Sequence, residues 1–133
     1  PCHDSRYPYM PYADPEVPPV WPVEGHLFGY HYKSSVELVL KTASHCLTVE
    51  FLVDNISPRT FISLTTMQVL HPDVPPPTST RANLHGQDME LTLSPQSSHF
   101  ADLNVLGVDF LANCTHETDY AHSTCTLSMN GHK

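Results

Sequence analysis

Basic residues are scarce in this chain. Six Lys and Arg stand against fourteen Asp and Glu, which gives a formal net charge of −8 at pH 7. Proteins that bind nucleic-acid phosphates do so through clustered Lys and Arg side chains. The composition therefore argues against a nucleic-acid partner.

Long apolar runs are also missing. No stretch approaches the roughly 20 apolar residues of a membrane-spanning helix, so we expect no membrane insertion. The 133 residues fit one domain, and a hydrophobic content of 40% is enough for a core. The chain does not begin with Met and has no signal-peptide pattern, so we expect an excised domain or mature fragment of a larger protein. Its compartment stays open, with an intracellular one favoured.

The usual cofactor and metal patterns are absent. The sequence has no phosphate-binding glycine loop and no Gly-x-Ser-x-Gly elbow. Cys114-x-His116 and His122-x-x-Cys125 do not have the spacing of common zinc fingers, so we expect neither a metal nor a cofactor. Cys46 lies in an apolar run and is expected to be a small buried hydrophobe. The cysteines admit three disulfide pairings, and they are Cys2, Cys46, Cys114 and Cys125.

Prolines and aromatic residues gather at the N-terminus. Proline restricts the backbone and has no N–H, so residues 1–24 predict neither a helix nor a central strand. This segment is either a solvated linker or an extended arm whose rings pack on the domain or on a partner. We assign residues 1–33 to the arm. It contains Pro1, Pro8, Pro11, Pro15, Pro18, Pro19 and Pro22, with Tyr7, Tyr9, Tyr12 and Trp21 among them.

Alternating apolar residues predict β-strands in the first half of the domain. Residues 34–41 alternate, and residues 46–53 return antiparallel to deliver Asp54 to a loop. Residues 63–70 predict a short strand or a helical turn, which His71-Pro72 ends.

The second half has its own strand pattern. Residues 73–80, which contain Pro75, Pro76 and Pro77, predict an irregular connection. Residues 81–93 then predict a hairpin with Gly86 at its turn. Residues 108–112 predict a short helix, and residues 124–129 predict a last strand.

Two motifs carry a family resemblance. The first is Leu52-Val53-Asp54, followed by Ser57 and Phe61-Ile62-Ser63; the second is Leu-Asn-Val-Leu-Gly-Val-Asp-Phe-Leu over residues 103–111. In this order they resemble the motifs of retropepsins, the dimeric aspartic proteases of retroviruses and long-terminal-repeat retrotransposons. The resemblance covers about residues 34–130. It implies an all-β fold, a small closed retropepsin-type β-barrel over residues 34–133 with one short α-helix, in a homodimer joined through terminal strands.

The first motif departs from the family at its centre. The resemblance implies that Asp54 from two subunits shares a proton and activates a water. The family has Thr or Ser and then Gly after this Asp, where this chain has Asn55 and Ile56 before Ser57. Glycine tolerates close approaches that a β-branched residue does not, so these residues predict an impaired catalytic site.

The second motif is expected to be structural. The resemblance implies that Leu106 lies in a strand threaded behind the Asp54 loop. Glycine at position 107 allows either a tight passage of the backbone or a turn. Asp109 would cap the helix that follows or pair with a charge.

The position of the flap, the segment that closes over substrate in the family, has two alternatives. It is either the hairpin turn at His85, Gly86 and Gln87 or the proline-rich loop over residues 72–77. The interval between Gly86 and Gly107 is too short for both a flap and the hairpin that follows it in the family, so one of the two is shortened or absent.

We therefore expect a retrotransposon-derived, catalytically impaired pseudoenzyme that acts as a dimerisation and protein-interaction module in a larger protein. A protein or peptide partner would bind in the former substrate cleft or at an outer sheet edge. One alternative is an active dimeric aspartic endopeptidase that uses Asp54 from each subunit. Another is a secreted, disulfide-linked β-domain. Enzymatic activity is thus uncertain, with its absence favoured.

Overall fold

The computed structural model describes residues 13–29, 33–95 and 102–130. This part of the chain holds one nine-stranded sheet and two helices, so the predicted all-β class is confirmed. Neither helix is long and apolar enough to cross a membrane. The strands are β1 (Val23–Phe28), β2 (Lys33–Lys41), β3 (Cys46–Val53), β4 (Phe61–Ile62), β5 (Ser79–Leu84), β6 (Gln87–Leu93), β7 (Val105–Leu106), β8 (Cys114–Asp119) and β9 (Thr124–Met129), and the helices are α1 (Leu64–Leu70) and α2 (Val108–Leu111).

Six of the strands close into a ring. Their order is β3-β7-β4-β6-β5-β2, and the pairing of β2 with β3 completes the circle. Alternate residues of each strand point inward, and Leu38 of β2 and Phe51 of β3 are fully buried there. The antiparallel β2–β3 hairpin follows the predicted alternation closely. The core therefore fills the inside of the ring.

The two helices are short and follow strands. Ser63 caps α1, because its Oγ accepts a hydrogen bond from the Thr66 N–H at 3.1 Å. The helix ends at His71, directly before Pro72. Of the two structures predicted for residues 63–70, the helical turn is confirmed. The short helix predicted after Gly107 is α2.

The ring contains the same arrangement twice. In each copy, an antiparallel hairpin is followed by a parallel pairing of its second strand. The second strand of the β2–β3 hairpin, β3, runs parallel to β7, and the second strand of the β5–β6 hairpin, β6, runs parallel to β4. The Asp54 N–H donates to the Leu106 carbonyl and the Ser94 N–H donates to the Ile62 carbonyl, both at 2.9 Å. Asp54 and Ser94 therefore hold matching positions, and a helix follows each parallel partner strand.

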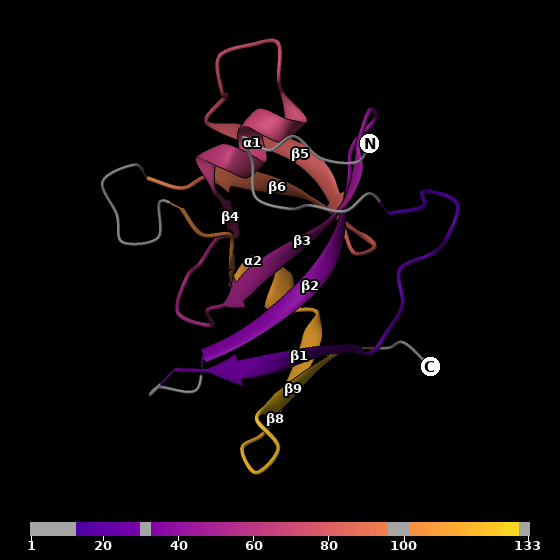
Figure 1. The fold of residues 1–133 in the computed structure, drawn as a ribbon, viewed down its shortest axis with the longest axis vertical. Coiled ribbons are helices and arrows are strands. Elements are labelled where there is room, and N and C mark those ends of the chain that lie inside the picture. The colour runs from indigo at the N-terminus through magenta and orange to yellow at the C-terminus, as the bar shows by residue number, and fades with distance from the viewer. Residues whose placement is uncertain (1–12, 30–32, 96–101, 131–133) are drawn as a thin grey trace.

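The strands β1, β9 and β8 extend the sheet beyond the ring and lie below β2 in Figure 1. The first residues of β1 pair with β9 and its last residues pair with β2. Gly25 lies where β1 passes from one partner to the other. A Cβ atom at Gly25 would be 2.2 Å from the backbone oxygen of Ser35. The close crossing of β1 over β2 thus requires a residue without a side chain.

The terminal segments differ from the expectations in two ways. Residues 23–28 were assigned to the arm, yet they form β1, a strand with partners on both sides. β9 was expected to pair with its twin across a dimer, but it lies between β1 and β8 of its own chain. A strand paired on both sides has no free edge to offer. Among the strands of the described ranges, β8 is the one with a single partner.

The Gly25→Ala variant is expected to lose about 3 kcal/mol of unfolding free energy, the upper end of the usual cost of overpacking. The clashing atom is a backbone oxygen, which cannot rotate away. Urea denaturation followed by circular dichroism measures this. His26→Ala, at an exposed position on the same strand, should change stability by no more than about 0.5 kcal/mol. Equal losses in the two variants would contradict the crossing argument.

Candidate functional site

Asp54 lies in the loop that leaves β3, as predicted. Its backbone N–H bonds to β7, and its half-buried side chain accepts a hydrogen bond at Oδ1 from the Ile56 N–H at 3.0 Å. The Ser57 N–H donates to the Asp54 carbonyl at 3.3 Å. The carboxylate is therefore held by its own loop in one orientation.

The second motif braces this loop from behind. The Val108 N–H donates to the Ser57 carbonyl at 2.8 Å, directly after Gly107. A Cβ atom at Gly107 would lie 2.1 Å from the Arg59 carbonyl oxygen and 2.8 Å from that of Ser57. Glycine is needed here for close approach of two backbones, as the sequence predicted.

Asp109 lies in the first turn of α2, but it is neither the N-cap nor in a salt bridge within the described residues, and its carboxylate bonds to Thr60 instead. Its Oδ1 accepts from the Thr60 hydroxyl at 2.7 Å and from the Phe110 N–H at 2.8 Å, and its Oδ2 accepts from the Thr60 N–H at 3.1 Å. The Thr60 hydroxyl also accepts from the Gly107 N–H at 3.1 Å. Thr60 is fully buried and links the two ends of the site.

Asn104 is the second residue that sequence reasoning missed. Its Oδ1 accepts from the Ser63 N–H at 2.9 Å and from the Thr66 hydroxyl at 2.8 Å, and its Nδ2 donates to the Glu50 carbonyl at 3.2 Å. It thus ties β3, α1 and the entry to β7 together. An amide directly before the apolar pair of β7 was the available signal.

Ile56 does not distort the loop. The non-glycine residues with positive φ in the described chain are His85 and Ser123, so the backbone of Ile56 has an ordinary conformation. Its side chain is 85% exposed. Ile56 therefore exposes an apolar side chain beside Asp54 without straining the loop.

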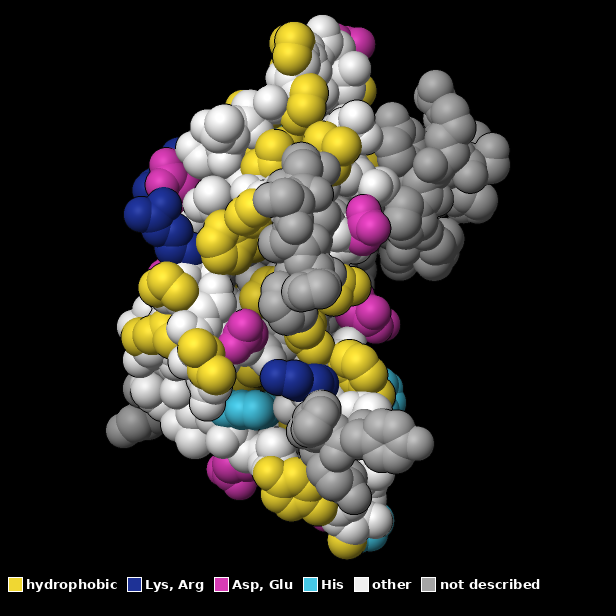
Figure 2. Space-filling model, turned by 90° about the vertical axis from the view of Figure 1, so that its left-hand side faces the viewer, with side chains coloured by type: hydrophobic (Ala, Val, Ile, Leu, Met, Phe, Trp, Pro, Cys, Tyr) yellow, Lys and Arg dark blue, Asp and Glu magenta, His cyan; other side chains and the backbone are white. Residues whose placement is uncertain are grey.

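The loop lies on the side of the molecule that faces the viewer in Figure 2, where apolar side chains gather in several places among charged ones. Ile56 and Val108 are exposed apolar residues on the two neighbouring segments of this site. No second carboxylate bonds to Asp54 within the described ranges. One copy of the chain thus supplies one acid, and a proton-sharing pair requires another copy.

The structure does not bring the hairpin turn at His85, Gly86 and Gln87 to Asp54. The His85 N–H donates to the Val39 carbonyl on β2, and Val39 pairs with Thr48 of β3. Thr48 precedes Asp54 by six residues, which is about 20 Å along a strand. This hairpin therefore does not cover Asp54 within one chain. The other alternative, the proline-rich loop over residues 72–77, projects from the top of the molecule in Figure 1, away from the loop that leaves β3.

The candidate zinc ligands are dispersed. His116 Nε2 lies 3.1 Å from Ser34 Oγ, and His122 Nδ1 lies 2.8 Å from Asp119 Oδ2 at the surface. Cys125 is buried, and no group of three His, Cys, Asp or Glu in the described residues could hold a metal. Burial raises the pKa of the Cys125 thiol and lowers the pKa of His116. The hydrogen bond from His122 lowers the pKa of Asp119.

The cysteines bear on the disulfide-linked alternative. Those at positions 46, 114 and 125 are free, and Cys2 lies outside the described residues. Cys46 is buried in β3, as predicted. Burial raises the pKa of the Cys114 thiol, which favours its protonated form.

Comparison with known proteins adds no relative. No family model, curated protein or solved structure that was compared with the chain matches it.

Replacement of Thr60 by Val should destabilise the protein by about 1–3 kcal/mol, because the buried Gly107 N–H loses its acceptor. Thr60→Ser keeps the hydroxyl and loses one methyl group, at a cost of about 0.8 kcal/mol. In urea denaturation, the unfolding free energy should be highest for the wild type, lower for Thr60→Ser and lowest for Thr60→Val. A Val variant as stable as the wild type would show that the hydroxyl does not support the site.

Proposed function

We propose that this chain is a catalytically impaired, retropepsin-like domain that acts as a homodimerising protein-interaction module in a larger protein. The observation that carries the proposal is Ile56, an apolar side chain 85% exposed beside the only carboxylate of the loop. An exposed β-branched side chain here occupies space that substrate and water would need. The same side chain suits a contact between proteins.

The arrangement of strands supports the retropepsin-type part of the proposal. β7 lies between β3 and β4, parallel to the first and antiparallel to the second, and α2 follows it directly. This arrangement supports the strand and helix that the resemblance implies behind the Asp54 loop. The Gly107 contact and the Thr60–Asp109 hydrogen bonds give both motifs a physical role in one small region.

The proposed dimer joins two copies at the Asp54 loops. Ile56 and Val108 would supply apolar contact area, and the two Asp54 carboxylates would face each other near the axis. Two close carboxylates disfavour each other's charged form, so dimer strength would depend on pH. β9 has no free edge, so this dimer differs from the expected terminal-strand dimer.

A peptide partner has a separate place to bind. The Asn130 N–H donates to the Asn113 carbonyl, which places the odd-numbered residues of β8 in hydrogen-bonded pairs with β9. The backbone groups of Cys114, His116 and Thr118 then point toward the open edge of β8. An extended peptide could add there as a strand.

The alternative is an active endopeptidase with one Asp54 from each subunit as the acid–base pair. One observation favours it. The backbone N–H of Ile56 holds Asp54 Oδ1, and a residue of any type except proline can supply that N–H. Loss of the glycine has therefore not removed the contact that orients the carboxylate.

The dimer predicts a mass near twice 14.9 kDa by light scattering at tens of micromolar protein. Ile56→Glu adds a negative charge beside each Asp54. The dissociation constant of the dimer should therefore rise at least about tenfold, a loss of about 1.4 kcal/mol of binding free energy. Val17→Glu is the matched control, since Val17 is 56% exposed and lies outside the loop. A monomeric wild type, or equal weakening by both variants, would refute the proposed contact.

Impaired catalysis predicts no hydrolysis of a mixed peptide library between about pH 4 and pH 7, in the wild type or in Asp54→Asn. The double variant Asn55→Thr/Ile56→Gly reinstates the family's residues and tests whether the surface beside Asp54 is the obstacle. Hydrolysis by the double variant alone would support the proposal. Hydrolysis by the wild type that disappears in Asp54→Asn would establish the endopeptidase instead.

A further inference from the structure

Residues 13–22 cross the outside of the sheet, and we call them the strap. At its first end the Ala13 N–H donates to the Cys46 carbonyl at 2.8 Å. In its middle, Lys41 Nζ donates to the Pro15 carbonyl at 3.4 Å, and residues 14–18 are exposed. A groove of about 890 Å³ separates this part of the strap from β2 and β5. The middle of the strap therefore stands off the sheet.

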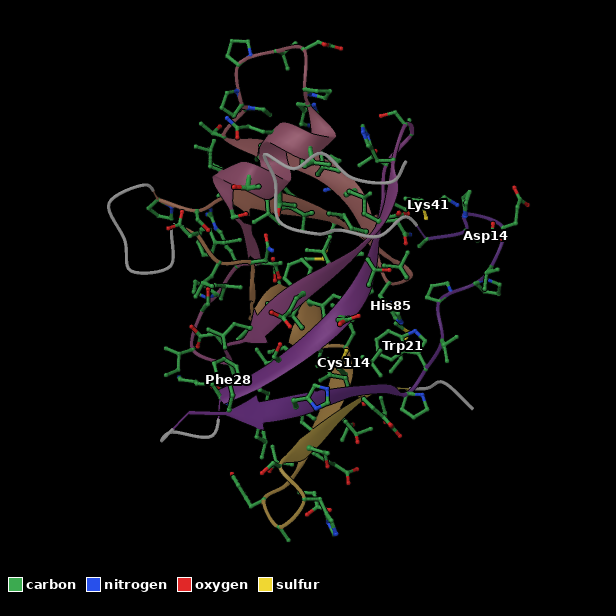
Figure 3. The ribbon with its side chains drawn as sticks, viewed as in Figure 1. Asp14, Trp21, Phe28, Lys41, His85 and Cys114 are labelled. Atoms are coloured by element: carbon green, nitrogen blue, oxygen red, sulfur yellow. The ribbon has the colours of Figure 1, made fainter. Side chains whose placement is uncertain are left out.

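The second end of the strap is held by His85, at the turn between β5 and β6. Its Nε2 lies 2.8 Å from the Val20 carbonyl, and its Nδ1 lies 3.0 Å from the Val39 N. The Trp21 ring meets the His85 ring edge-on at 4.9 Å and stacks on Phe110 at 6.3 Å. Figure 3 shows Trp21 and His85 beside each other where the strap reaches the sheet.

The two hydrogen bonds define the protonation state of His85. The Val39 N–H is a donor, so Nδ1 must be the unprotonated acceptor. The Val20 carbonyl is an acceptor, so Nε2 must carry the hydrogen. A second proton would go to Nδ1 and face the N–H of Val39. Protonation therefore breaks the side-chain bond to β2, leaves the Nε2–H bond to Val20 in place, and puts a charge in a site that is only 5% exposed, which favours a conformation in which the ring and the strap reach water.

The turn itself does not explain a histidine at this position. φ is 48° at His85 and 99° at Gly86, between the paired residues Leu84 and Gln87. Two-residue turns of this kind prefer Asn, Asp or Gly at the first position, because these residues tolerate positive φ. Histidine also tolerates positive φ better than most residues, so the turn admits His85 without requiring it. The bonds to the strap and to β2 give the histidine a purpose that the turn does not.

No charged side chain of the described ranges bonds to the His85 ring. Two of the neighbouring carboxylates are engaged elsewhere, Asp88 with Asn83 and Asp109 with Thr60. Burial accordingly lowers the pKa of His85, and the bond to the Val20 carbonyl opposes this only in part. The titratable side chains on the surrounding elements are Asp14 and Glu16 on the strap, Lys33, Glu37 and Lys41 on β2, Arg81 on β5, Asp88 and Glu90 on β6, Asp109 on α2, and Cys114, His116, Glu117 and Asp119 on β8.

We infer that His85 is a pH-sensitive latch, which holds the strap on the sheet at neutral pH and releases it in mild acid. Release would uncover the apolar contact between Trp21 and Phe110 and open the groove beneath the strap. The latch requires neither a protease-like site nor a dimer.

The direction of the effect follows from the two states of the ring. In the released strap His85 meets water and has an ordinary pKa near 6.5, whereas in the latched strap burial lowers its pKa. The released state therefore binds the proton more readily. The strap therefore stays attached above about pH 6.5. As the pH falls below this toward the lowered pKa of the attached state, the equilibrium constant for attachment decreases by up to about tenfold per pH unit.

Trp21 is the only tryptophan, so its fluorescence reports on the strap directly. We would measure quenching of Trp21 by acrylamide, a neutral quencher, from about pH 7.5 down to about pH 5 in the full chain. Quenching should rise below about pH 6.5, while circular dichroism shows an unchanged β-sheet. Constant quenching would refute the latch, and so would loss of the sheet over the same range, because release would then be global unfolding.

The decisive variant is His85→Asn, which tolerates positive φ and cannot titrate. Its quenching should not depend on pH in this range. The matched control His122→Asn removes an exposed histidine at the β8–β9 turn and should keep the wild-type transition. The same transition in His85→Asn, or its loss in His122→Asn, would assign it to another group and overturn the inference.

Discussion

The contact on which the structure depends most is the passage of β7 between β3 and β4, made possible by the missing side chain of Gly107. A Cβ atom at this position would overlap the Arg59 carbonyl oxygen. Because the backbones come so close, the Val108 N–H bonds to the loop after β3, and the buried Thr60 hydroxyl joins Gly107 to Asp109. The ring of strands closes through β7, so the fold and the position of Asp54 have the same cause.

This brace explains how the loop can change its chemistry and keep its shape. Asp54 is held by backbone groups, which do not depend on the residue types around it. Ile56 therefore lies in the loop without backbone strain, and its effect lies in the side chain that it exposes. In the proposed function, a surface that would receive substrate becomes one that contacts a protein.

The strap follows a different principle. Most of its residues are exposed, and its attachment near Trp21 depends on one buried imidazole with a hydrogen bond at each nitrogen. A single proton can upset such an arrangement, whereas the ring of strands closes through backbone pairing between β2 and β3. Regulation and stability are thus carried by separate parts of the molecule.

The sequence by itself determined the elements whose signal is local. The pattern of apolar residues predicted β2, β3, the β5–β6 hairpin and β9. The two motifs predicted that Asp54 lies near Gly107. Only the tertiary structure decided the helix over residues 63–70, the two partners of β9, the inclusion of β1 in the sheet and the distance between His85 and Asp54. These features depend on which strand edges meet, and that choice is made by contacts between distant residues, such as the approach of Gly25 to Ser35. Periodicity reports which face of a strand is buried, but it carries no information about the strand that will lie beside it.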